Sequence, residues 1–222
     1  MMKKTVAIIT LVFGLLIYAN ESYAVDVEAF IKAGTIDSDE ENHSMATGRK
    51  VMLDVGIKVS TGKKLLQQLT AEYWTMAEPV NGDRELPHDG LSFIYEISYL
   101  FSGNNLDFYP YIGIGLERWR RNSPDEGDQD RYYGDLYFSE FTAGIGTKYR
   151  SYYFKGGVLL PFWSDTDSGQ RPDGKLGFTL NAGYLWKKFD LGAFFRESSF
   201  GSDGSQPDFQ LRQYGLIIGY KF

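Results

Sequence analysis

The sequence predicts an all-β fold: a closed antiparallel up-and-down β-barrel that crosses a membrane with ten strands. Its segments alternate between apolar and polar residues with a period of two, which indicates β-strands. The connections between these segments are short and long by turns, as in transmembrane barrels with tight periplasmic turns and long extracellular loops. The chain also contains 25 Gly, 16 Tyr, 16 Phe and 4 Trp, and short segments rich in glycine and aromatics are typical of barrels and sandwiches.

Residues 1–24 have the pattern of a secretory signal peptide. Two lysines precede an apolar run at 6–18, and Ser22-Tyr23-Ala24 forms a small-x-small cleavage site. A retained membrane helix is the alternative, but the run is shorter than the ~20 apolar residues that span a bilayer. We therefore expect cleavage at about Ala24, export through the periplasm and one outer-membrane barrel domain over residues 25–222.

The predicted strands follow one another along the whole mature chain. They cover approximately residues 25–36, 50–60, 64–78, 90–102, 106–119, 136–149, 152–163, 176–187, 189–198 and 210–222. The short connections are expected at 60–63, 102–105, 150–151 and 187–188, and the long ones at 37–49, 79–89, 120–135, 164–175 and 199–209.

The last segment separates an apolar face from a face of small or polar residues. The apolar face comprises Tyr214, Leu216, Ile218, Tyr220 and Phe222. An alternating strand that ends on a lipid-facing aromatic resembles the C-terminal assembly signal of Gram-negative outer-membrane barrels. This resemblance implies an interaction with the barrel-assembly machinery during biogenesis.

The glycines indicate which face of each strand is inside. From the fifth segment onward they fall on the polar face, at Gly113, Gly115, Gly144, Gly146, Gly157, Gly183, Gly192, Gly215 and Gly219. Glycine on a concave barrel wall relieves crowding and permits bending, whereas on a solvated face it would only weaken the strand. Parity then points eleven charged residues into the interior: Lys32, Asp54, Lys58, Glu72, Glu96, Glu117, Glu140, Lys148, Lys155, Asp190 and Arg196.

These inward charges predict a plugged interior. Eight strands leave a lumen that side chains fill, so ten strands lie near the filled limit, and charges held there must pair or stay hydrated. By residue count we expect Arg196 to clamp Glu72, Glu96 and Glu140, with Lys58, Lys148, Lys155 and Asp190 pairing nearer the periplasm. The alternative is a narrow wet passage along the glycine-lined wall.

Aromatic residues at the strand ends predict two girdles at the membrane interfaces. The girdle toward the long connections is expected to contain Tyr73, Trp74, Trp119, Tyr137, Phe162, Trp163, Phe178, Phe195 and Tyr214.

The chain resembles the small outer-membrane barrels of the OmpA, OmpX and Opa type over its whole mature length. The resemblance rests on the signal peptide, the motifs Tyr109–Leu116 and Ala143–Tyr149, and Phe222. It implies the architecture well and the activity hardly at all. The leading hypothesis is a non-enzymatic envelope protein, surrounded by outer-membrane lipid and lipopolysaccharide. Those families have eight strands, so an eight-stranded barrel is the alternative to the ten counted above.

Composition excludes several functions. Without Lys3, Lys4 and Glu21 the chain has 21 basic and 28 acidic residues, a net charge of −7, which argues against nucleic acid as a partner. The absence of cysteine excludes thiolate catalysis and cysteine metal sites, and we expect no cofactor.

The long connections are acidic, and they suggest contact with an extracellular ligand. Oxygen-rich clusters there could gather Ca²⁺, although none matches a calcium-loop spacing. His43 and His88 are placed in the first two long connections beside carboxylates. A histidine–carboxylate pair would suit a protease such as the ten-stranded omptins, but the sequence has no matching Asp-Asp and Asp-His pairs at the strand tops. His43-Ser44 would suit a lipid A deacylase, but that family carries these groups on a strand, whereas this pair lies in an acidic connection. A surface or envelope protein is therefore favoured over a small channel, and a channel over an enzyme.

Overall fold

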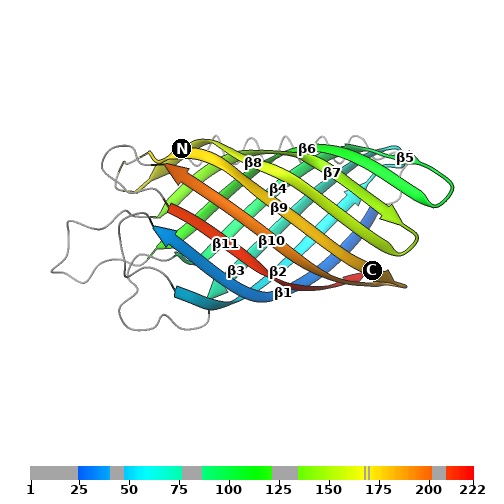
Figure 1. Cartoon of the computed structure of the whole chain (residues 1–222), viewed down its shortest axis with the longest axis horizontal. Helices are drawn as coiled ribbons and strands as arrows, with labels where there is room; N and C mark the ends of the chain where they lie inside the picture. The colour runs from blue at the N-terminus through cyan, green and yellow to red at the C-terminus, as the bar shows by residue number, and fades with distance from the viewer. Residues whose placement is uncertain are drawn as a thin grey trace.

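The computed structural model is a closed antiparallel barrel of ten long strands (Figure 1). It describes residues 25–40, 48–76, 87–121, 135–167, 169, 171–201 and 209–222. The strands are β1 Val25–Glu40, β2 Gly48–Thr61, β3 Leu65–Met76, β4 Pro87–Tyr99, β6 Leu106–Arg121, β7 Leu136–Tyr149, β8 Tyr152–Thr166, β9 Asp173–Trp186, β10 Phe189–Gly201 and β11 Phe209–Lys221. A two-residue piece, β5 Phe101–Ser102, continues the line of β4 along β6.

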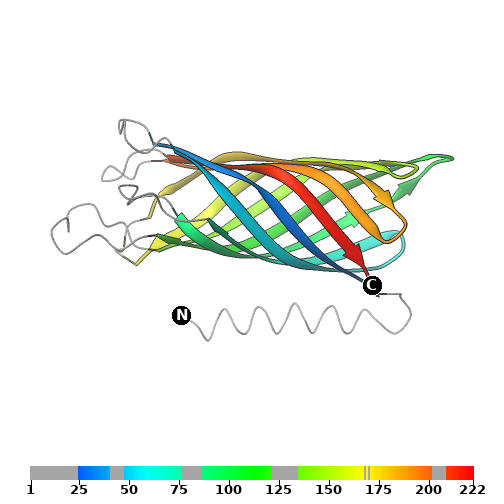
Figure 2. The same ribbon diagram turned by 90° about the horizontal axis from the view of Figure 1, so that it is seen from below.

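Each strand pairs with its neighbours in the chain, and β1 pairs with β11 to close the barrel (Figure 2). The ladder across this seam runs from Glu28↔Lys221 to Glu40↔Phe209. Gly34 and Gly215 face each other within it, and a Cβ on either would overlap the backbone of the other strand. Ten strands confirm the predicted count, and the eight-stranded alternative is wrong.

Several strands extend further toward the long connections than predicted. β1 continues to Glu40, β8 to Thr166 and β10 to Gly201. Charged residues that resemble loop sequence, such as Asp37 and Asp165, therefore belong to strands. His88 lies within β4 rather than in a connection, and His43 lies outside the described residues.

The outer surface of the barrel is apolar. Val51, Ile112 and Leu216 leave 66%, 65% and 66% of their surfaces exposed, while their sequence neighbours on the opposite face point into the lumen. A continuous apolar exterior around strands whose backbone groups pair with each other is what a lipid bilayer requires. The polar face is inside, as the glycines predict.

No helix among the described residues is long and apolar enough to cross a lipid bilayer.

An apolar core fills the lumen toward the long connections. It contains the buried residues Ile36, Met52, Trp74, Trp119, Leu136, Phe138, Phe194, Phe200 and Leu211. Three of its rings pack edge to face, with centroids 4.9 Å apart for Trp119 and Phe138, 5.7 Å for Trp119 and Phe200, and 5.0 Å for Phe138 and Phe200. The prediction that Trp74 and Trp119 belong to an interfacial girdle is wrong. Each lies two residues after an inward-pointing glutamate, Glu72 or Glu117, and therefore points into the lumen as well.

Tyrosine rings occupy the space that inward glycines leave in the other half of the lumen. Tyr109 lies over Gly146, Tyr111 over Gly144 and Gly157, and Tyr153 over Gly183 and Gly192, so that a Cβ at any of these glycines would overlap a ring or hydroxyl. The glycine-lined wall is therefore filled by side chains of neighbouring strands over this stretch, which removes the main argument for a continuous wet passage.

Candidate functional site

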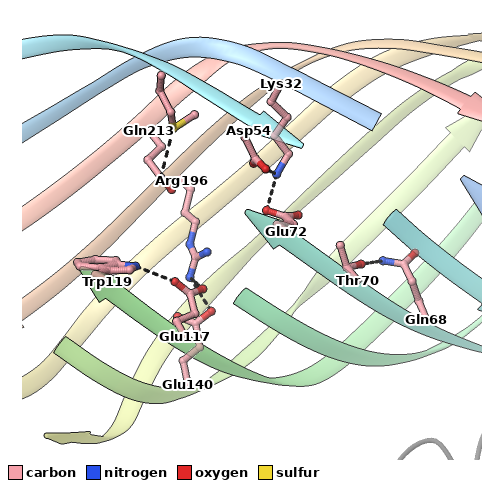
Figure 3. Close-up of polar contacts among 11 residues, drawn as sticks. Lys32, Asp54, Gln68, Thr70, Glu72, Glu117, Trp119, Glu140, Arg196 and Gln213 are labelled. Atoms are coloured by element: carbon pink, nitrogen blue, oxygen red, sulfur yellow. Dashed lines mark hydrogen bonds and ion pairs between the residues drawn. The ribbon is translucent and has the colours of Figure 1, made fainter. Parts of the chain in front are cut away.

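The first element of the lumen site is a buried arginine held between two carboxylates. Arg196 on β10 reaches across to β6 and β7, where it pairs with Glu117 and, at 2.8 Å, with Glu140 (Figure 3). The side chains of Arg196 and the two glutamates expose only 14%, 1% and 1% of their surfaces. The Trp119 indole nitrogen donates to Glu117 Oε2 at 3.0 Å, so this charged layer connects directly to the apolar core.

A second cation, Lys32, also lies between two carboxylates. Lys32 Nζ on β1 is 3.1 Å from Asp54 Oδ2 and 2.7 Å from Glu72 Oε2 (Figure 3). The same ammonium stands over two aromatic rings, 5.1 Å from the centroid of Phe30 and 5.4 Å from that of Phe194. Carboxylates and ring faces therefore enclose Lys32 from several strands.

A third ion pair joins two strands that are separated by β6 and β7. Lys155 Nζ on β8 lies 2.8 and 2.6 Å from the two carboxylate oxygens of Glu96 on β4, and it stands 4.3 Å above the ring of Tyr111. The amide of Gln68 also donates to Glu96, at 3.0 Å. This contact crosses the lumen between strands that are not neighbours in the sheet.

Nearer the short connections the lysines are more accessible, whereas Glu28 and Asp190 are buried. Lys58 Nζ lies 3.1 Å and Lys221 Nζ 3.9 Å from Glu28. The hydroxyl of Tyr153 donates a hydrogen bond to Asp190. Lys148 lines the same space, and no ion pair joins it to another residue in the described part of the chain.

The structure redistributes the partners that residue counting suggests. Arg196 binds Glu140, but Glu117 takes the second position, while Glu72 pairs with Lys32 and Glu96 with Lys155. The strands are strongly tilted (Figure 1), so equal counts from the strand ends do not correspond to equal depth in the lumen. Sequence reasoning also omitted Glu28, although its parity with Lys32 places it inside.

A cavity of about 490 Å³ lies among these groups. It extends from Asp26 and Lys221, near the short connections, to Arg196 and Glu140 beneath the apolar core. Asp26 is exposed, which marks this end as the open mouth. The cavity is therefore a cup with a charged floor.

Some residues that line this cup have a buried polar atom without a hydrogen-bond partner among the described residues. These atoms are Asp54 Oδ1, Glu140 Oε2, Asp190 Oδ1 and Arg196 Nε. Within the same described ranges, no group of three or more histidine and acidic side chains is arranged to hold a metal ion.

The terminal strand places its apolar face on lipid. Leu216, Ile218 and Phe222 expose 66%, 59% and 73% of their surfaces, and Tyr220 packs against Phe189 and Phe222 with centroids 5.3 Å away in each case. The backbone N–H of Phe222 donates to the carbonyl of Val27 at 3.0 Å, so the last residue is tied to β1.

No model of a known protein family matches the sequence, and no curated protein matches it. Solved structures with a similar fold include neisserial surface protein A (NspA), with 13% identity and TM-score 0.44 over 91% of this chain and 100% of that chain. Another is the outer-membrane protease OmpT from Escherichia coli, with 11% identity and TM-score 0.48 over 91% and 99%. A third is the translocator domain of the autotransporter NalP from Neisseria meningitidis, with 12% identity and TM-score 0.43 over 99% and 98%. At these values no activity, ligand or partner is transferred to this chain.

Proposed function

We propose that the protein is an integral outer-membrane β-barrel of a Gram-negative envelope, non-enzymatic and closed to steady ion flow, which presents its long acidic connections at the cell surface. The observation that carries the proposal is the filled section of the lumen. There the apolar core lies directly on the Arg196–Glu117–Glu140 layer. A rigid closed wall with a blocked interior suits a protein that displays loops and anchors them in lipid.

The apolar exterior supports the membrane location. In lipid every backbone polar group must be satisfied internally, which a closed barrel achieves without an edge. Expected surroundings are lipid and lipopolysaccharide, and a signal peptide at residues 1–24 would deliver the chain to the periplasm for assembly.

The pairing of the buried charges supports a non-enzymatic role. The buried carboxylates of the floor are held by Lys32 and Arg196, and charges paired in this way stabilise a structure rather than transfer protons to a substrate. A small channel is the second candidate, because the polar cup already opens at one end and only the apolar section separates it from the other.

Conductance distinguishes these two functions. In planar bilayers the native protein should show little or no steady current, because the apolar section excludes hydrated ions. Replacing Trp119, Phe138 and Phe200 by alanine should introduce single-channel conductance steps, because the change removes the three rings that pack against each other. Large, stable steps from the native protein would contradict the closed barrel.

The control for the conductance experiment removes outward side chains instead. Alanine at Val51, Ile112 and Leu216 removes apolar groups that face lipid and leaves the lumen intact. This variant should therefore show no steady conductance. Heat-shifted gel mobility should show both triple variants to be folded before they are compared.

The topology gives a second prediction. Gly62 lies in the short turn after β2, and Gly169 lies in the connection between β8 and β9. Epitope tags at Gly169 or at Gly127, which lies outside the described residues, should be labelled on intact cells. A tag at Gly62 should be labelled only after the outer membrane is permeabilised. Labelling at Gly62 on intact cells would invert the orientation.

A further inference from the structure

The short connections, at 62–64, 103–105, 150–151 and 187–188, carry cations and no carboxylate. The cations are Lys63, Lys64, Arg150, Lys187 and Lys188, and all of them are exposed. Within the described part of the chain none of these side chains forms an ion pair. The long connections are acidic, so the two ends of the barrel differ in the sign of their charge.

The turn between β9 and β10 holds a cation in a backbone conformation that does not favour it. Lys187 has a φ of 56°, as Arg150 in the β7–β8 turn has a φ of 58°. This is the left-handed region, which glycine and asparagine adopt more readily than residues with long side chains. Two-residue hairpin turns of this kind commonly hold Asn-Gly. The geometry of the turn therefore does not explain why a lysine stands at position 187.

The two lysines of this turn lie over rings on the lipid-facing surface. Trp186, Phe189 and Tyr220 form an aromatic band across β9, β10 and β11, with ring centroids 6.1 and 5.3 Å apart, and all three rings are exposed. Lys187 Nζ stands 5.6 Å from the ring centroid of Trp186, and Lys188 Nζ stands 5.7 Å from that of Tyr220. Because exposed aromatic rings at strand ends lie at the level of the lipid headgroups, both ammonium groups lie in that layer.

We propose that the Lys187-Lys188 turn binds the headgroup of an anionic phospholipid, whose acyl chains lie along the aromatic band. Basic groups beside a membrane attract lipids with a net negative charge, and these two lack acidic partners among the described residues. Contact with the ring faces holds each ammonium at the bilayer surface, which favours a lipid headgroup over a soluble acidic partner. The inference rests on the membrane location proposed above.

The test is quenching of Trp186 fluorescence by brominated phospholipid, with the full chain refolded into vesicles of equal parts phosphatidylglycerol and phosphatidylcholine. Trp163→Phe removes the other exposed tryptophan, while Trp74 and Trp119 are buried in the lumen, so the quenching reports lipid at Trp186. Bromine on phosphatidylglycerol should quench more than bromine on phosphatidylcholine, corresponding to a preference of at least about threefold. High salt should reduce this preference, because it screens exposed charges.

Variants of two turns locate the preference. Lys187→Asn with Lys188→Gln removes both cations, and asparagine suits the φ of 56° better than lysine does, so this variant should fold and lose the preference. Lys187→Arg with Lys188→Arg should retain it. The matched control, Lys63→Gln with Lys64→Gln, removes the same charge from the β2–β3 turn, which β1 and β11 separate from the β9–β10 turn. This control should keep the preference at Trp186.

The outcomes separate the lipid site from the membrane location. Equal quenching by the two brominated lipids in the native turn would overturn the site and leave the membrane location intact. A preference that survives the loss of Lys187 and Lys188, or that disappears equally in the control, would also overturn the site. Absence of quenching by either lipid would overturn both proposals.

Discussion

Replacing Arg196 by alanine is expected to destabilise the folded barrel by about 3–5 kcal/mol, the range for breaking a buried ion pair by removing one partner. The change leaves Glu117 and Glu140 facing each other without their cation in a part of the lumen where both are almost fully buried. It also removes the bridge from β10 to β6 and β7. Urea unfolding in detergent micelles, followed by tryptophan fluorescence, measures the loss.

The matched control is Arg171→Ala. Arg171 is also paired with a carboxylate, Asp165, but 76% of its side chain and 27% of that of Asp165 are exposed, and exposed pairs contribute about 0.2–1 kcal/mol. A small loss for Arg171→Ala beside a large one for Arg196→Ala would place the effect in the buried layer. Adding Glu140→Gln to Arg196→Ala should recover part of the stability, because one uncompensated charge is removed. Equal losses for the two arginines would contradict the structural role of the clamp.

Much of the barrel can be predicted because β-structure has a period of two. Alternation assigns a side to each residue, and a closed barrel has only two sides, so Asp54 and Arg196 are placed inside without knowledge of their partners. Glycine on the polar face then identifies which side is concave. The number of strands follows from counting alternating segments, and the structure confirms ten rather than eight.

Parity fails where the ladder is irregular or where composition is misleading. Phe162 and Trp163 are neighbours in sequence, yet both are exposed, because β8 bulges opposite Ser139 and Glu140. Tryptophan is common at membrane interfaces, so residue type favours a girdle position for Trp119. Its alternation with Glu117 favours the lumen instead, and the structure places it there.

The partners within the site are harder to predict than its members. Which cation reaches which carboxylate depends on strand tilt and on the register between strands distant in sequence. Lys155 binds Glu96 across the lumen because both arrive at the same depth, which counting along separate strands cannot show. The position of the Tyr109 ring over Gly146 also depends on register, because the two residues are partners in the β6–β7 ladder. This contact can be tested directly.

Gly146→Ala is expected to destabilise the barrel by about 1–3 kcal/mol, the usual cost of overpacking, because the new methyl group would overlap the Tyr109 ring. Tyr109→Ala should also destabilise it, since the ring fills space in the lumen. In the double variant, however, the overlap disappears. The free energy of unfolding should then fall by less than the sum of the two single losses, and a double-mutant cycle measures this coupling.

Gly215→Ala provides the control for that cycle. Its Cβ would meet the backbone of Ala33 and Gly34 across the β1–β11 seam rather than a side chain, so removing the Tyr109 ring cannot relieve it. Gly215→Ala and Tyr109→Ala should therefore be additive within about 0.5 kcal/mol. If Gly146→Ala were equally additive with Tyr109→Ala, the ring would not occupy the glycine's space. The lumen wall at β7 would then be open, and water could pass further along it than the filled interior allows.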